Sequence, residues 1–132
     1  LATRAMPRIA VLGLAYKENT HSTKNSPSLA LLARLQGRAE LRVHDPVVPA
    51  SITPAAAGCS DPLSCAEGAD ALVLATPWPQ YRSLDPKSLA GVMRGRILVD
   101  PFRLLPADEA VAAGFAYYAL GMPALLPASG AR

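Results

Sequence analysis

Short apolar runs, each stopped by a turn residue, recur along this chain and constrain its fold more than any other feature. They predict strands at residues 8–12, 41–44, 71–75, 96–99 and 115–119. The residues that stop them are Gly13, Asp45-Pro46, Thr76-Pro77, Asp100-Pro101 and Gly121. Continuous apolar runs of this kind are typical of strands that are covered on both faces of a parallel sheet.

Helix starts lie between these runs, and most are marked by a capping residue followed by proline. The pairs are Ser26-Pro27, Asp61-Pro62 and Asp85-Pro86. The side-chain oxygen can cap free backbone amides, and proline suits the first helical position. The helix over residues 29–36 is apolar on nearly every side, so we expect it to be well buried.

The alternation of strands and helices predicts the fold class. We expect an α/β, Rossmann-like, doubly wound and mainly parallel sheet of about five strands, with helices on both faces. One domain should cover residues 8–123, with flexible ends at 1–7 and 124–132, where the tail from Leu125 frays. Residues 46–60 form the longest irregular stretch and are expected to be a mobile loop.

Composition narrows the class of protein. Of 132 residues, 51% are hydrophobic and 17% charged, which indicates a packed globule. No apolar run reaches the roughly 18 residues that a membrane span needs. The start is too short and polar for a signal peptide and lacks Met, so we expect a cytoplasmic chain cut from something longer. A net charge of +3 on scattered cations, with 5% aromatics, argues against nucleic-acid binding.

Metal and nucleophile signals are absent from the sequence pattern. Cys59 and Cys65 are expected to be reduced thiols, because no set of metal ligands accompanies them. His21 and His44 are single and far apart, and we interpret them as surface or packing residues. Asp108-Glu109 falls in the first turn of a helix that begins at Pro106, where the helix dipole favours acids. We therefore predict no catalytic residue and no metal site.

A ligand site is expected beyond the carboxyl ends of the strands, as in other open α/β sheets. The strongest candidate is the segment after Gly13, because Lys17 and Lys24 lead to a helix amino terminus, an arrangement that favours phosphate. The alternative is that both lysines are only solvated. Leu14 and Ala15 follow Gly13, so the Gly-x-Gly-x-x-Gly fingerprint is missing and this domain is not expected to cradle NAD itself.

Two further pairs of residues carry alternatives. Asp45 and Asp100 each follow a strand and precede proline. They could accept hydrogen bonds from ligand hydroxyls, but we favour a role in organising strand-ending turns. Trp78 and Tyr81 could form a stacking surface, although such residues more often cover a sheet edge or a domain interface.

Motifs in a fixed order resemble the carboxy-terminal domain of the UDP-glucose/GDP-mannose dehydrogenase family. The first is VLGLAYK at residues 11–17, followed by Asn19-Thr20 and Ser26-Pro27. The later matches are VHDP at 43–46, ADALVLAT at 69–76 with Trp78 and Tyr81, LVD at 98–100 with Leu104-Leu105, and AGF at 113–115 running to Tyr118 and Gly121. The first motif is fairly specific to the family, and the ordered series over about residues 8–123 is more so.

The resemblance implies part of an oxidoreductase of polysaccharide biosynthesis. The family oxidises a nucleotide sugar, such as UDP-glucose, at C6 to the uronic acid in two NAD-dependent steps. An amino-terminal domain binds NAD, a central helical region drives dimerisation, and a cysteine forms a thiohemiacetal. This chain resembles only the third part, which binds the nucleotide sugar. Since the family's Gly-Gly-x-Cys motif is missing, we expect the chain alone to be inactive, with the other domains of a homo-oligomeric parent as its partners.

The resemblance also implies roles for individual residues. Tyr16 and Lys17 match the aromatic-lysine pair that contacts the nucleotide sugar. Lys24 stands where the family usually has an arginine that reaches the NAD, so it is the cofactor contact implied here. Phe102 takes the place of another family arginine, and Arg103 beside it is the substrate-binding candidate. The alternative is a divergent Rossmann-like structural or partner-docking module that binds no ligand. The sequence leaves the identity of the nucleotide sugar open.

Overall fold

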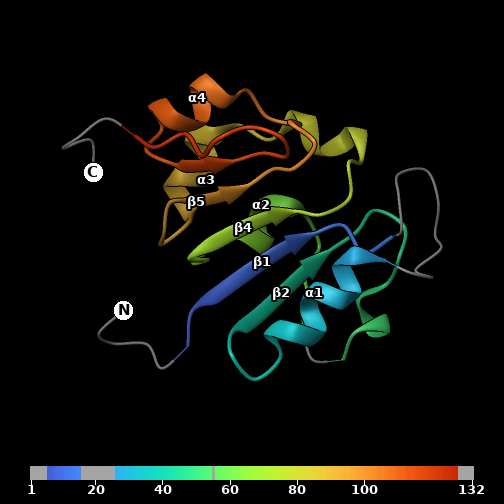
Figure 1. Cartoon of the computed structure of the whole chain (residues 1–132). Helices are drawn as coiled ribbons and strands as arrows, with labels where there is room; N and C mark the ends of the chain where they lie inside the picture. The colour runs from blue at the N-terminus through green and yellow to red at the C-terminus, as the bar shows by residue number, and fades with distance from the viewer. Residues whose placement is uncertain (1–5, 16–25, 55, 128–132) are drawn as a thin grey trace.

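Parallel strands in the order β3-β2-β1-β4-β5-β6 form one sheet at the centre of the molecule (Figure 1). The computed structural model describes residues 6–15, 26–54 and 56–127. The strands are β1 Arg8–Leu12, β2 Glu40–His44, β3 Ala57–Gly58, β4 Ala71–Leu74, β5 Ile97–Val99 and β6 Ala116–Tyr118. The predicted α/β, doubly wound, parallel fold is confirmed.

The helices lie on both faces of the sheet. They are α1 Pro27–Leu35, α2 Pro62–Ala66, α3 Pro86–Val92 and α4 Ala107–Ala112, with 3-10 turns η1 Ala50–Ile52 and η2 Pro79–Ser83. The chain runs one way along the sheet from β1 to β2 and the other way from β4 to β6, so right-handed crossovers place α1 opposite α2, α3 and α4. Figure 1 shows α1 in front of the strands and α2 behind them. Within the described ranges no helix is long and apolar enough to cross a membrane.

The capping residues behave differently at the three proline-led helix starts. The Asp61 carboxylate accepts a hydrogen bond from the Ser64 amide at 2.9 Å, as predicted. The cap predicted for Ser26 is wrong, because its hydroxyl donates instead to the Leu14 carbonyl at 2.8 Å. The Asp85 side chain makes no capping hydrogen bond at the start of α3 either. The prolines therefore mark where the helices start, while the side chains serve different contacts.

Two segments expected to be irregular are ordered by pairing with the sheet. The predicted loop over 46–60 contains η1 and also β3, where Gly58 pairs with Val43 of β2. Ala57–Gly58 has little strand propensity, so the neighbouring strand stabilises it and the sequence did not indicate it. The expectation of a frayed tail is wrong for Leu125, which exchanges backbone hydrogen bonds of 2.7 and 2.9 Å with Tyr117. Whether the ends are flexible otherwise stays a prediction.

The core lies mainly on the face that α2, α3 and α4 cover. Side chains pointing to that face are fully buried: Leu12, Leu72, Leu74, Leu98 and Tyr117. The prediction that α1 is well buried is wrong, because only Ser28 and Leu32 of that helix are buried. Its remaining leucines are half-buried, since no other α-helix of the described residues lies beside α1 on its face of the sheet.

A matched pair of glycines tests this packing. A Cβ at Gly95 would collide with the backbone of Asp70, whereas a Cβ at Gly91 in α3 would meet nothing within 4 Å. We expect Gly95→Ala to lower the free energy of unfolding by about 1–3 kcal/mol through overpacking. Gly91→Ala should raise it by about 0.5–1 kcal/mol through helix propensity. Urea unfolding of both variants checks this, and equal midpoints would contradict the described packing.

Candidate functional site

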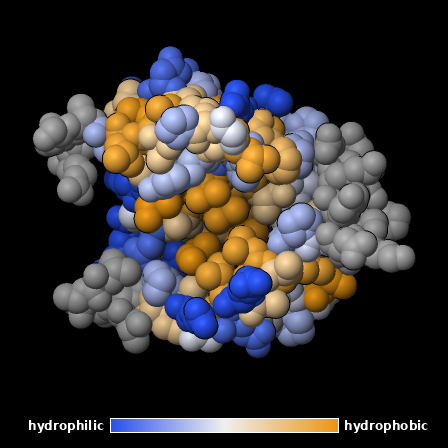
Figure 2. Space-filling view, viewed as in Figure 1, coloured by the Kyte–Doolittle hydropathy of each residue, from blue (hydrophilic) through white to orange (hydrophobic). Residues whose placement is uncertain are grey.

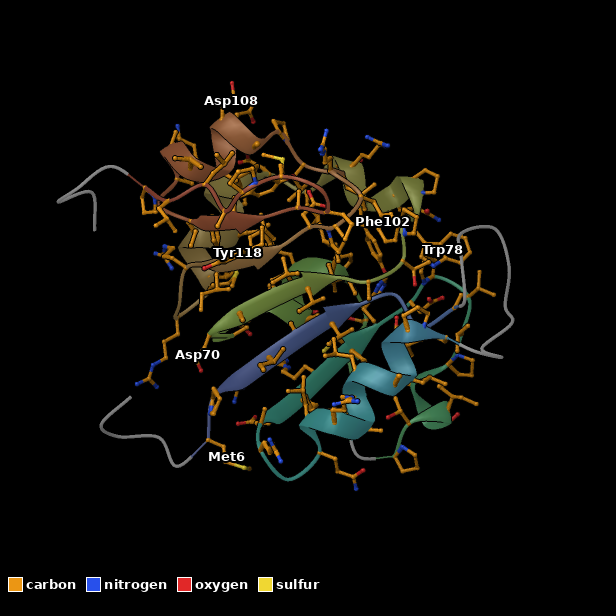
Figure 3. The ribbon with its side chains drawn as sticks, in the orientation of Figure 1. Met6, Asp70, Trp78, Phe102, Asp108 and Tyr118 are labelled. Carbon is orange, nitrogen blue, oxygen red and sulfur yellow. The ribbon has the colours of Figure 1, made fainter. Side chains whose placement is uncertain are left out.

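The candidate site lies at the carboxyl edge of the sheet, where the loops after β1, β2, β4 and β5 meet. Parallel strands bring these loops together although they are far apart in sequence. Figure 3 shows Trp78, beyond β4, and Phe102, beyond β5, at this same end of the molecule. The structure thus brings these strand exits together, and the prediction that a ligand binds there stays a prediction.

The Asp45 carboxylate ties three of these loops together. Its Oδ2 accepts hydrogen bonds from the Leu14 amide at 2.7 Å, the Ala15 amide at 3.1 Å and the Trp78 indole at 3.0 Å. Its Oδ1 accepts from the amides of Val47 and Val48, both at 2.8 Å. Burial opposes ionisation of Asp45, but these backbone hydrogen bonds together hold its pKa below the ordinary value. Asp45 therefore organises the loops, which is the role favoured from the sequence.

Gly13 lets the loop after β1 approach the loop after β4. Its backbone has a φ of 106°, and a Cβ there would lie 2.6 Å from the Thr76 nitrogen. The Thr76 hydroxyl in turn donates to the Ala15 carbonyl at 2.9 Å. Any larger residue at position 13 would force these loops apart. The backbone position of Ala15 is thus fixed on both its amide and its carbonyl side.

The amino terminus of α1 points to the same region. The Ser26 hydroxyl donates to the Leu14 carbonyl, so the side chain of this N-cap residue does not cap the amides of α1. Ser28 Oγ is fully buried and has no hydrogen-bond partner in the part of the chain that the structure describes. Uncapped amides at a helix start attract an anion.

The loop after β5 is organised by a second aspartate. The Asp100 carboxylate accepts from the amides of Leu104 and Leu105, both at 2.9 Å, and from the Tyr117 hydroxyl at 2.9 Å. Asp100 is fully buried, so it also serves the turn and not a ligand. Between these anchors, Arg103 is held at a φ of 55°, and Phe102 is 46% exposed.

The predicted site residues fall into two groups. Tyr16, Lys17 and Lys24 lie outside the described residues. Arg103 is exposed beside the site, and its guanidinium lies 3.4 Å from the Leu120 carbonyl. Their roles stay predictions.

Trp78 and Tyr81 do not form a stacking surface. They are 4% and 0% exposed, so they are packed inside the protein and not open to a ligand. The Tyr81 hydroxyl donates to the His44 carbonyl at 3.1 Å and lies 3.0 Å from His44 Nδ1. The sequence did not indicate this contact, because nothing in it pairs position 44 with position 81.

Cys59 directly follows β3, and its amide donates a hydrogen bond to the Val43 carbonyl at 2.9 Å. Cys65 is fully buried in α2, and burial raises its pKa, so it is not a thiolate at neutral pH. Cys59 is free and half-buried. Among the described residues, no group of three or more His, Cys, Asp or Glu side chains could hold a metal ion.

The chain is similar in sequence to one protein family and to several curated proteins. Residues 10–107 match the model of the UDP-glucose/GDP-mannose dehydrogenase family, UDP binding domain. A UDP-glucose 6-dehydrogenase of Pseudomonas aeruginosa is 38% identical over 125 residues, which cover 87% of this chain and 28% of that protein. A UDP-N-acetyl-D-mannosamine dehydrogenase of Pyrococcus horikoshii is 40% identical over 94 residues, covering 70% of this chain and 21% of that protein.

Solved structures show the same fold. The UDP-D-ManNAc dehydrogenase structure from Pyrococcus horikoshii superposes with a TM-score of 0.75 at 32% identity, over 89% of this chain and 26% of that one. An NDP-N-acetyl-D-galactosaminuronic acid dehydrogenase from Methanosarcina mazei superposes with a TM-score of 0.77 at 25% identity, over 88% and 25%. The chain thus spans little more than a quarter of the length of its curated relatives, at 28% for each of the first two.

The role of Asp45 can be tested against a matched aspartate. Asp45→Asn turns one acceptor oxygen into a donor that faces backbone amides, so we expect the free energy of unfolding to fall by about 2–4 kcal/mol. The control is Asp85→Asn: Asp85 also precedes proline, but its side chain is exposed and accepts from Ser88 Oγ at 3.1 Å. It should change stability by less than about 0.5 kcal/mol. Urea unfolding of the two variants measures both, and equal losses would contradict the role of Asp45.

His44 predicts a pH dependence of stability. Burial lowers the pKa of His44, because the charged imidazole is desolvated beside Tyr81. The unfolded chain therefore binds a proton more readily, so stability is full above the ordinary histidine pKa of about 6.5 and is lost as pH falls through the folded pKa. The urea midpoint should be measured from about pH 7.5 to about pH 5, the range in which histidine titrates. As the pH decreases, the midpoint should fall in the wild type and should change less in His44→Gln. An unchanged slope in His44→Gln would reject this origin.

Proposed function

Because the chain belongs to the UDP-glucose/GDP-mannose dehydrogenase family, in which it matches the UDP binding domain, we propose that it binds a nucleotide sugar at the carboxyl edge of its sheet. It does so as the carboxy-terminal domain of an NAD-dependent 6-dehydrogenase. The parent enzyme oxidises UDP-glucose, or a related UDP- or GDP-sugar, to the uronic acid. The family match carries the proposal, since residues 10–107 include every loop of this edge.

The geometry supports an anion site where the family match expects a diphosphate. Asp45 and Thr76 hold the backbone up to Ala15, two residues before Lys17. At the start of α1, the side chain of the N-cap residue Ser26 makes no cap, and the hydroxyl of Ser28 is buried. A lysine ammonium and free amides complement phosphate oxygens, so Lys17 binds the diphosphate and Tyr16 packs beside it. Arg103, exposed on the loop after β5, supplies a second cation.

The oxidation itself requires parts that these residues do not carry. NAD supplies the hydride acceptor and a cysteine supplies the nucleophile in this proposal, and both lie outside the 132 residues. The curated relatives are long enough to hold them, because the chain covers 28% of the Pseudomonas aeruginosa enzyme. Lys24 reaches toward the NAD as the contribution of this chain to the cofactor site.

Lys17 provides the test, in the complete polypeptide that carries this chain. Isothermal titration with UDP-glucose, UDP-N-acetylmannosamine and GDP-mannose should find one that binds. Lys17→Ala should weaken the binding of that sugar by roughly 10- to 100-fold, because it removes one charge-assisted hydrogen bond of about 1.5–3 kcal/mol. Lys87→Ala, on an exposed lysine of α3 that lies beside Glu109 and Ala112 of α4, is the matched control and should bind as the wild type does.

Two results would contradict the proposal. If none of the three nucleotide sugars binds the complete polypeptide, the chain is a divergent structural or docking module. Phe102, which stands where the family has an arginine, agrees with that alternative. If Lys17→Ala binds as well as Lys87→Ala, the sugar lies elsewhere. NAD reduction by the 132-residue chain alone would show that the catalytic parts are not outside it.

A further inference from the structure

One face of the sheet carries an apolar surface over β4, β5 and β6. Neighbouring strands are in register there: Ala71 pairs with Ile97, and Val99 pairs with Tyr118. Partners in register point to the same face, and the side chains on this face are Ala71, Val73, Ile97, Val99, Ala116 and Tyr118. Ile97 is 44% and Tyr118 39% exposed, and the other four are half-buried. We call these six residues the open face.

The open face has no cover within the described part of the chain. Right-handed crossovers place α2, α3 and α4 on the opposite side, and α1 lies over β1 and β2 (Figure 1). Figure 2 shows apolar residues gathered in the middle of this view, and Figure 3 places Tyr118 on the same side. Parallel sheets occur almost only with both faces covered by other elements. The half of this face over β4, β5 and β6 therefore lacks the cover that such a sheet normally has.

One flank of α1 borders the open face. Leu29, Leu32 and Ala33 line a hollow that they share with Ile52 of η1, which lies on the β3 side of the helix. The opposite flank, which carries Leu31 and Leu35, therefore faces toward β4, given 3.6 residues per turn. Both leucines are half-buried. The surface thus has an apolar floor and an apolar wall.

The dimensions of this surface fit a single helix. Three strands at about 4.8 Å spacing give a floor about 10 Å wide, which is close to the diameter of one α-helix with its side chains. We propose that an amphipathic helix from the rest of the parent polypeptide, outside these 132 residues, packs on the open face beside α1. This rests on the proposed function only in taking the chain as one domain of a longer dehydrogenase.

The length of the relatives favours this occupant. The chain accounts for 28% of the Pseudomonas aeruginosa UDP-glucose 6-dehydrogenase, so a parent of that length holds more than twice as many residues outside the chain as within it. A helix on the same polypeptide binds at a high effective concentration, which a second copy of the chain lacks. A second copy, offering its own α1 to the open face, is the other occupant that the test separates.

Thiol labelling can test the proposal. Ile97→Cys and Tyr118→Cys place single reporters on the open face, in a Cys59→Ser background with Cys65 left buried. The matched control is Leu63→Cys on α2, which is 38% exposed and lies on the opposite side of the sheet. Maleimide labelling of each peptide is followed by mass spectrometry, in the 132-residue chain and in the complete polypeptide.

All three positions should label at similar rates in the 132-residue chain. In the complete polypeptide, positions 97 and 118 should label more slowly than position 63 by on the order of tenfold or more, because the helix must first detach. Hydroxyl-radical footprinting of Ile97 and Tyr118 in the unsubstituted protein should give the same protection, so the result does not depend on how well the variants fold.

Two outcomes would overturn the proposal. Equal rates at the three positions in the complete polypeptide would mean that the open face stays exposed. Protection already present in the 132-residue chain, and lost on dilution, would assign the face to a second copy. The labelling readout uses no nucleotide sugar, so the two proposals can fail separately. Sugar binding without protection of the open face rejects only the packed helix. Protection without sugar binding rejects only the proposed nucleotide-sugar substrate.

Discussion

The Asp45 carboxylate is the interaction on which the carboxyl edge of the sheet depends. It joins the segment after β1, the turn after β2 and the indole of Trp78 after β4. An ionised acceptor serves all of these donors at once, and each such bond is stronger than one between neutral groups. Gly13 allows the close approach that the carboxylate then holds, since Thr76 occupies the space of a Cβ. The edge is therefore pre-organised before any ligand arrives.

This arrangement separates residues that build the edge from residues that can serve a ligand. Asp45 and Asp100 both stand where a ligand-binding carboxylate would be expected, yet their oxygens are occupied by backbone amides and by Trp78 or Tyr117. Among the described residues of the loop after β5, Phe102 and Arg103 remain exposed at this edge, and the guanidinium of Arg103 suits an anionic ligand better than a neutral one.

The sequence predicted what local pattern determines and missed what only tertiary pairing determines. The apolar runs at β1 and β4 and the proline-led helix starts were correctly located, because strand periodicity and capping positions are local. Ala57–Gly58 forms a strand only because β2 lies beside it, and Ser26 leaves its cap because the Leu14 carbonyl lies within reach. The meeting of Asp45 with Trp78 likewise depends on the order of the strands, which adjacent residues do not encode.

The over-prediction of burial has a physical meaning of its own. Residues 29–36 are apolar on nearly every side, and the runs at β4 and β5 are apolar without alternation. Both patterns are typical of elements enclosed on all sides. In the described part of the structure only Ser28 and Leu32 of α1 are buried, and β4 and β5 keep one face open. The two discrepancies lie next to each other, since Leu31 and Leu35 border the open face, so one missing neighbour accounts for both. The composition of these elements is thus suited to a larger protein than the 132 residues themselves form.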